Sequence, residues 1–315
     1  MGQFFINQLK LRDAFILVVC AILLSVSCSS QREGSVSQNT AAETREVTDE
    51  AGRRVSVPLR VERIVTLAPN LTEIVYVVGA GNRLVGNTTY CNYPAEAMRV
   101  TKIGDTMQPN IERIVALRPQ LVLVSTASQL EAFTRQLNEQ GIAVYVTDPR
   151  SLEDVFRSIK SLGELLNEAE RAEQVVNDLR ARASAVEAAV KTSSPVKVFY
   201  QVSAAPLYTI GREAFLTDLI RRAGGQSVTA DVPGAFPRYS DEAALATQPE
   251  AIILSVDSSM DEGNAKPAPS LAKSPAVTSG RVYGINGDLL SRPGPRLVEG
   301  LEQMARVLHP EDFKQ

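Results

Sequence analysis

The sequence predicts an α/β protein with two Rossmann-like lobes, each built on a parallel sheet, joined by one long bridging α-helix. Short apolar strand patterns alternate with helical patterns over residues 46–166 and again over residues 193–315, which is typical of parallel sheets with right-handed crossovers. Between them, residues 167–192 form one uninterrupted helical pattern. The length of 315 residues also favours two lobes, because it exceeds what one core usually serves.

Composition restricts the possible classes of function. A content of 44% hydrophobic and 22% charged residues is ordinary for a folded α/β protein. The formal net charge is −3, and no tract of Lys and Arg is interleaved with aromatic residues. We therefore expect no nucleic-acid partner.

The first 28 residues have the features of a bacterial lipoprotein signal peptide. Lys10 and Arg12 precede an apolar run, residues 14–26, that is shorter than the roughly 20 residues of a membrane span. Small residues and then Cys28 follow, and residues 29–45 form a polar, Ser-rich, flexible tether. We expect lipidated Cys28 to anchor the chain to the membrane in a periplasmic or extracytoplasmic location. The alternative is an ordinary secretory signal in which Cys28 has no role.

Cysteine and histidine are too scarce for the commonest metal sites. After Cys28 only Cys91 remains, so we expect no disulfide within the mature body. One histidine, His309, excludes Cys/His zinc sites and His-pair motifs, and no spacing marks a carboxylate or Tyr site. We assign no metal site and no cofactor, and we expect His309 to cap the carbonyls of the last helix.

The N-terminal lobe, residues 46–166, begins with a hairpin over residues 47–58 and a short strand over 63–69. The helix that follows has Asn70 as its expected cap and Glu73 in the capping-box position. A short helix is predicted from Pro94.

A second capped helix follows at Asn110. Ile111 and Ile114 share its apolar face, so Glu112 points outward. The buried strand 121–125 comes next, then a helix, a strand and a helix over residues 128–141, 142–147 and 151–166. The tetrapeptide Glu-Arg-Ile-Val occurs at residues 62–65 and at residues 112–115. It leads into a strand in the first place and belongs to a helix in the second, so we do not interpret it as a repeat.

The helix at residues 167–192 is expected to be about 36 Å long and to bridge the lobes. The alternative is a helix packed within one lobe. In the C-terminal lobe, residues 193–315, strands are predicted at 196–203, 206–211 and 281–286, helices at 213–225 and 295–309, and a helix followed by a strand at 240–255.

Five motifs carry a resemblance to a known family: RIVTLAPNLTEIVYVVGAG, CNYP, NIERIVALRPQLVLVS, IGREAFLTDLIRRAGG and RPGPRLVEGLEQMARVLHP. In this order, over nearly all of residues 46–310, they resemble the iron-siderophore and cobalamin periplasmic binding proteins, the helical-backbone receptors of ABC importers. The resemblance implies a monomeric, non-enzymatic receptor that delivers a small-molecule ligand to a permease and its ATPase subunits. It also implies a largely preformed interlobe cleft and small lobe movements.

The cleft is expected to be lined by loops of both lobes. Aromatic residues supply flat apolar walls, and polar residues anchor a ligand's rim. For any one of the aromatics, packing in the core is the alternative. The candidate ligand-binding residues are Asn70, Tyr90, Tyr93, Thr106, Met107, Ser125, Tyr208, Phe236, Arg238, Tyr239, Asp288, Arg292 and Arg296.

The resemblance is nearest to the cobalamin branch, so a corrinoid ligand is placed first and a ferric siderophore or haem second. The chain departs from that branch in having no Trp, and Thr106, Ser125 and Phe236 stand where Trp residues surround the corrin ring. A reading from another class is a ligand-free structural lipoprotein.

The resemblance further implies that one Glu near the tip of each lobe meets Arg residues of the permease. Glu112 matches the first, and Glu242, beside Asp241, matches the second. The alternative is that both are ordinary solvated charges. No Gly-x-Ser-x-Gly elbow, phosphate-binding loop or Rossmann glycine pattern is present, so we predict no enzymatic activity.

Overall fold

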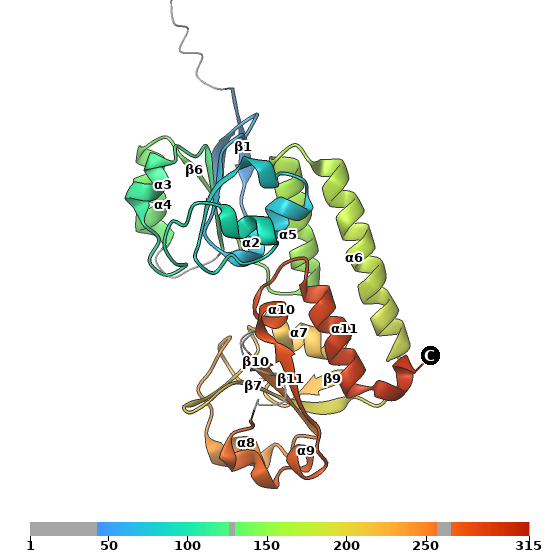
Figure 1. Cartoon of the computed structure of the whole chain (residues 1–315). Helices are drawn as coiled ribbons and strands as arrows, with labels where there is room; N and C mark the ends of the chain where they lie inside the picture. Colours follow the sequence, from blue (N-terminus) through green and yellow to red (C-terminus); the bar gives the residue numbers. More distant parts are fainter. Residues whose placement is uncertain (1–42, 126–129, 257–265, 315) are drawn as a thin grey trace, which may run out of the picture. The chain divides into compact units, whose positions relative to one another are not determined.

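The structure is a computed structural model that describes residues 43–125, 130–256 and 266–314 (Figure 1). The predicted signal peptide, Cys28 and most of the predicted tether lie outside the described residues. Residues 44–315 cluster as one unit by their internal contacts. Among the helices that the structure describes, none combines the length and the apolar character needed to cross a membrane.

The N-terminal lobe contains a hairpin and a four-stranded sheet. The hairpin pairs antiparallel strands, and the buried carboxylate of Asp49 accepts hydrogen bonds from the turn amides of Ala51 and Arg53. The sheet is entirely parallel, in the order β4-β3-β5-β6. The strands are β1 Thr44–Thr48, β2 Arg54–Pro58, β3 Ile64–Thr66, β4 Leu84–Asn87, β5 Leu121–Ser125 and β6 Ala143–Thr147.

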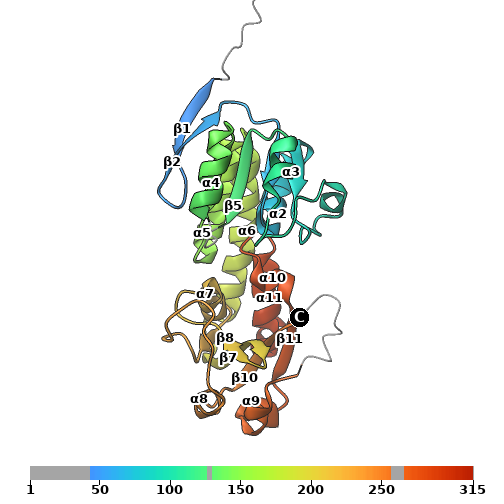
Figure 2. The ribbon, with the colours of Figure 1, turned by 90° about the vertical axis from the view of Figure 1, so that its left-hand side faces the viewer.

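Helices cover both faces of this sheet (Figure 2). On β5, Leu121 and Leu123 face one core cluster, with α2 and α5, whereas Val122 and Val124 face another, with α3 and α4. A strand that is buried on both faces explains the continuous apolar run in the sequence. The helices are α2 Pro69–Val77, α3 Ile111–Ala116, α4 Leu130–Glu139 and α5 Leu152–Leu165, and a 3-10 turn spans Ala95–Arg99.

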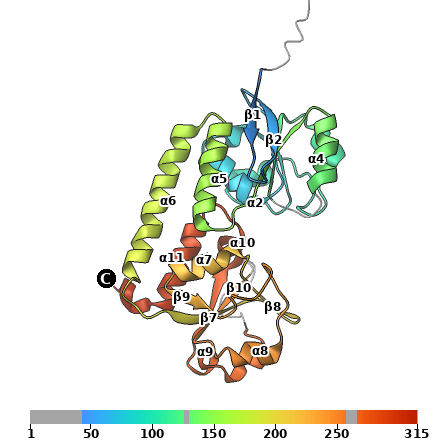
Figure 3. The ribbon, with the colours of Figure 1, turned by 180° about the vertical axis from the view of Figure 1, so that it is seen from behind.

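The long helix α6, Ala169–Ala189, packs against α5 of the first lobe and α11 of the second (Figure 3). Its buried stripe includes Ala172, Val176 and Leu179 and belongs to the core cluster shared by both lobes. Gly163 of α5 lets the two helices approach closely, because a Cβ there would lie 2.2 Å from that of Ala172. The packing supports the bridging interpretation over a helix confined to one lobe.

The C-terminal lobe is a second, mostly parallel sheet of order β11-β10-β7-β8, in which β9 also pairs with β7 and only β8 is antiparallel. On β10, Ile253 faces the shared core with α7 and α11, whereas Ile252 and Leu254 face a smaller cluster with α8 and α9. The elements are β7 Val196–Ala204, β8 Leu207–Thr209, α7 Phe215–Arg222, β9 Gly225–Ser227, α8 Asp241–Ala246, β10 Ala251–Val256, α9 Pro275–Thr278, β11 Val282–Asn286, α10 Gly287–Ser291 and α11 Leu297–Leu308.

The fold class is therefore confirmed, but one local prediction was wrong. Helix α2 begins at Pro69 with Ala68 at its N-cap, so Asn70 lies inside the first turn and Glu73 is not a capping-box residue. His309 is the C-cap of α11 as expected, because its backbone N–H donates to the carbonyl oxygen of Ala305, whereas its side-chain Nε2 atom lies 2.9 Å from the carbonyl oxygen of Gly224.

An internal structural repeat relates the two lobes, although the repeated tetrapeptide does not mark it. Asn110 and Ser240 each cap a six-residue helix through their side chains. Each helix is followed by a residue with positive φ, Arg118 or Gln248, then by a proline and a central strand. Every feature is displaced by the same 130 positions (110 to 240, 118 to 248), so Glu112 and Glu242 occupy equivalent positions.

Candidate functional site

The candidate site lies where the N-terminal lobe meets the C-terminal lobe. Six of the predicted ligand-binding residues are at this junction: Asn70, Tyr90, Tyr93, Asp288, Arg292 and Arg296. Beside it is a pocket of about 450 Å³, which is within the usual size range of ligand sites. The pocket is lined by Thr89, Tyr90, Asn92, Ser255, Val256, Gly287, Asp288, Ser291 and Arg292.

Glu73 is the centre of the junction. Its side chain is 2% exposed, and it accepts two hydrogen bonds from Arg296, at 2.7 and 3.0 Å, and one from Arg292 at 3.3 Å. A buried carboxylate requires such partners, because an unpaired charge in the interior is strongly unfavourable. This ion pair therefore joins α2 of one lobe to the start of α11 in the other.

Arg292 extends the network toward the pocket. Its guanidinium lies 2.6 Å from Asp288 and donates to the side-chain oxygen of Asn92 at 2.7 Å and to the carbonyl oxygen of Tyr90 at 3.4 Å. Asn92 in turn donates to Asp288. The two arginines and the two acids, Glu73 and Asp288, cancel in formal charge, so this cluster has no net charge to offer a ligand.

Arg296 is held from two sides. Its guanidinium lies 4.2 Å from the centre of the Tyr93 ring, within cation–π distance. Burial alone lowers the pKa of Arg296, but the hydrogen bonds and charge of Glu73, with the charges of Asp288 and Tyr93, outweigh it and raise that pKa above its ordinary value. Arg296 therefore remains a cation at the junction of the two lobes.

Asn70 fixes the backbone of the opposite lobe. Its side-chain amide donates to the carbonyl oxygen of Pro293 at 3.3 Å. A Cβ on Gly294 would lie 3.2 Å from that of Asn70, so the glycine permits the close approach. Asn70 thus contributes to contact between the lobes in this structure.

The loop that carries Tyr90, Asn92 and Tyr93 is held by a half-buried ammonium group. Lys102 donates to the side-chain oxygen of Asn87 and to the carbonyl oxygens of Thr88, Cys91 and Ala97, at 2.8 to 3.2 Å. Burial lowers the pKa of Lys102. The loop geometry at the pocket therefore depends on Lys102.

Cys91 belongs to the support of this loop. It is a buried free thiol whose sulfur lies 3.1 Å from the Thr72 hydroxyl and 3.2 Å from that of Thr88. These contacts assign Cys91 to packing beneath the loop.

The remaining predicted ligand residues do not line this pocket. Thr106 and Met107 lie in the turn before α3, and Ser125 ends β5. Tyr208 pairs with Arg238 through an isolated bridge, Phe236 is half-exposed, and the ring of Tyr239 packs on that of buried Phe199.

Several residues of the junction escaped the sequence analysis. Glu73 was assigned to capping, and Thr89, Asn92 and Ser291 were not singled out. Ser255 has a signal in the sequence, because it lies in β10 at the position that Ser125 occupies in β5 of the first lobe. Glu73 has none, since its partners lie more than 200 residues along the chain.

The two predicted docking residues are both exposed. Glu112 lies in the first turn of α3 and Glu242 in the first turn of α8. Asp241 differs from its neighbour because its carboxylate accepts a hydrogen bond from Ser270 at 2.7 Å. The equivalence by 130 positions also favours Glu242, because Asp241 corresponds to Ile111.

Comparisons with known proteins agree with this architecture. A family model described as periplasmic binding protein matches residues 64–289. An ABC transporter substrate-binding lipoprotein of Bacillus subtilis is 32% identical over 95% of this chain and 97% of its own. The crystal structure of a periplasmic vitamin B12-binding protein of Vibrio cholerae has a TM-score of 0.70 and 28% identity, over 81% of this chain and 99% of that one. A periplasmic haem-binding protein of Pseudomonas aeruginosa has a TM-score of 0.70 and 27% identity, over 79% and 93%.

Proposed function

This chain belongs to the periplasmic binding protein family of ABC importers, whose members bind solutes and are not enzymes, and from that premise we propose that its ligand is a corrinoid. The protein acts outside the cytoplasm, and its partners are a permease and the associated ATPase. The ligand is captured between the two lobes and delivered to the permease.

The observation that carries the proposal is the charge balance of the junction. Arg292 and Arg296 are already paired with Asp288 and Glu73, so an anionic ligand would have to displace a buried carboxylate. A corrinoid carries amide groups around its ring and needs hydrogen-bond donors and acceptors rather than a free cation. The pocket offers such groups in Thr89, Asn92, Ser255 and Ser291, and Tyr90 also lines it.

Haem is the second candidate, on one specific observation. Tyr90 is one of the residues that line the pocket, it is 56% exposed, and a tyrosine oxygen is a known axial ligand of haem iron. The similarity to a haem-binding protein supports this candidate as well. The two propionates of haem argue against it, because both arginines of the junction are occupied.

Titration of the purified protein with cyanocobalamin, haemin and a ferric hydroxamate separates the candidates. We expect cyanocobalamin to bind with one-to-one stoichiometry by calorimetry, and Asn92→Ala to weaken it. Arg99→Gln, at an exposed position outside the pocket, serves as the control. If the protein binds haemin and the Tyr90→Phe variant does not, the proposed ligand would be haem and not a corrinoid. A protein that binds none of the three would favour a ligand-free structural lipoprotein.

For the permease we propose docking through Glu112 and Glu242. The support is that both are exposed, that they occupy equivalent positions of the repeat, and that each follows a capped helix start. The double variant Glu112→Ala/Glu242→Ala should retain ligand affinity and lower the ligand-stimulated ATPase activity of the transporter, whereas Glu46→Ala should change neither. Loss of ligand affinity in the double variant would reassign the two residues to ligand binding.

We also propose that Cys28 carries the lipid anchor and that the receptor is a monomer. The support is the signal-like N-terminus and the relative described as a lipoprotein. Cys28→Ser should move the protein from the membrane fraction to the soluble fraction. Size-exclusion chromatography with light scattering should give one chain's mass, and a dimer mass would refute the monomer.

A further inference from the structure

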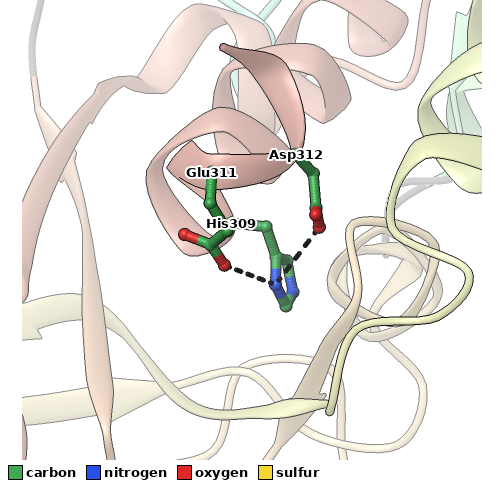
Figure 4. Close-up of side chains that lie close together, drawn as sticks. All are labelled: His309, Glu311 and Asp312. Atoms are coloured by element: carbon green, nitrogen blue, oxygen red, sulfur yellow. Dashed lines mark ion pairs between the residues drawn. The ribbon is translucent and has the colours of Figure 1, made fainter.

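A cluster of three potential metal ligands lies at the end of the chain, away from the pocket residues. Helix α11 ends at Leu308, and a 3-10 turn over Pro310–Phe313 folds back beside it. The turn brings the carboxylates of Glu311 and Asp312 to the imidazole of His309 (Figure 4). One ligand atom from each of the three lies within 4.8 Å of the others.

The position of the imidazole defines which nitrogen carries the proton. Nε2 lies 2.9 Å from the carbonyl oxygen of Gly224, and a carbonyl can only accept, so Nε2 is the N–H donor. Gly224 is required for this contact, because its φ is +78° and a Cβ would lie 2.5 Å from Nε2. In the neutral ring Nδ1 therefore has a free lone pair.

Two carboxylates lie near Nδ1. Nδ1 lies 4.0 Å from Glu311 Oε1 and 4.0 Å from Asp312 Oδ2. These distances exceed a hydrogen bond of about 2.7–2.9 Å between an imidazolium and a carboxylate. The His309 ring is 3% exposed and its Nε2 atom is fixed by Gly224, so Nδ1 stays beside the two carboxylates. Two carboxylates next to a nitrogen donor are stabilised by a cation between them.

We propose that His309, Glu311 and Asp312 form a site for a divalent transition-metal ion of the zinc class. One imidazole nitrogen and two carboxylate oxygens are the donors that zinc accepts, with bonds of about 2.0–2.2 Å. The separations of 4.0 Å would contract to about 3.4 Å around such an ion, a movement that the exposed Glu311 side chain can make. The nitrogen donor disfavours magnesium and calcium, which prefer oxygen. Glu311 is exposed, so water reaches the fourth position from the solvent side.

Two of the three ligands already have outer hydrogen-bond partners of the kind that orient metal ligands. The Gly224 carbonyl fixes the ring of His309, and the Ser193 hydroxyl donates to Asp312. The site would connect the chain end to the turn after α7 and to the segment after α6. A bound ion would stabilise the C-terminal lobe.

The test uses the mature full-length chain with a tag that lacks histidine, after removal of metal with a chelator. In competition with a chromogenic chelator, the protein should bind one zinc ion per chain. Free zinc at about 100 times the Kd of the site should raise the Tm of the protein by about 5 °C. Glu311→Gln, at an exposed side chain that the fold does not need, should weaken binding at least about tenfold, and Ser193→Ala about 10- to 100-fold. Glu299→Gln, exposed on the same C-terminal segment, is the matched control and should not change it.

The chain has a single histidine, so nitrogen-15 NMR of its ring reports on this site alone. Stoichiometric zinc should shift the Nδ1 resonance of this ring. A ring with both nitrogens protonated that does not respond to zinc would overturn the proposal in favour of a simple ion pair. Equal zinc binding by the parent chain and Glu311→Gln would overturn it as well.

Discussion

Replacing Glu73 by glutamine tests whether the ion network holds the two lobes together. The change leaves Arg292 and Arg296, with side chains 10% and 18% exposed, without the carboxylate that receives three of their hydrogen bonds. Breaking a buried pair from one side costs about 3–5 kcal/mol. Arg292 keeps Asp288 and Arg296 keeps the Tyr93 ring, so we expect the lower end, about 3 kcal/mol. At about 2–4 °C per kcal/mol, the Tm should fall by about 6–12 °C.

Urea unfolding followed by circular dichroism, together with calorimetry, measures this loss. Glu170→Gln, at an exposed position in the first turn of α6, is the matched control and should stay within about 0.5 kcal/mol of the parent. Adding Arg296→Met to Glu73→Gln should recover part of the stability, because the unpaired cation is then removed. If Glu73→Gln unfolds with the free energy of the control, the network does not hold the lobes together and the reasoning is wrong.

Three further changes test other parts of the structure. Lys102→Met leaves buried oxygens without their donor, so it should lower the free energy of unfolding, measured in urea, by about 2 kcal/mol. It should also weaken ligand binding in a titration, and an unchanged affinity would show that other contacts hold the loop. Burial alone raises the pKa of Asp218, but hydrogen bonds from Arg222 and Arg221 outweigh this effect, and the net result is a pKa below the ordinary value of 3.8. The stability that Asp218 contributes is therefore complete above pH 3.8 and is lost as the pH falls through the folded pKa. Asp218→Asn should therefore flatten the loss of stability as the pH falls below about 4, and an unchanged slope there would contradict this. Gly163→Ala forces α5 away from α6 and should lower stability by about 1–3 kcal/mol in calorimetry, whereas an unchanged Tm would mean that the spacing of the two helices adjusts freely.

The fold could be predicted because its signals are local. Asn110 caps α3 as expected, because its side-chain oxygen accepts a hydrogen bond from the amide of Arg113, three residues further on. The apolar run of β5 follows from burial on both faces. The buried stripe of α6 can likewise be recognised from apolar residues spaced three or four positions apart in the sequence. In each case sequence neighbours decide the structure.

The junction could be predicted only in part, because its contacts are not local. Arg292 and Arg296 were singled out through the family resemblance. Glu73 looked like a capping residue because a carboxylate three positions after Asn70 fits that pattern. Pro69 at the first helical position moved the helix start, and tertiary pairing with the arginines decided the role of Glu73. No spacing in a single sequence reports such a pair.

The internal repeat shows the same limit. Glu-Arg-Ile-Val repeats in the sequence without any structural meaning, whereas the true equivalence of residues 110–125 with 240–255 shares only four identities: Glu112, Ala116, Pro119 and Ser125 with their counterparts. Capping, helix length and the positive φ before a proline are kept through different residues. Backbone geometry therefore preserves the repeat after most side chains have changed.

If Glu112 and Glu242 dock as proposed, the repeat makes this molecule bivalent toward a partner with two-fold symmetry. It presents the same capped helix twice, with Glu112 on one and Glu242 on the other. When two weak contacts are carried by one body, the first raises the effective concentration of the second, so their strengths multiply rather than add. Loss of either glutamate alone would then remove most of the avidity. A fragment that contains one lobe would bind such a partner with far less than half of the affinity of the whole receptor.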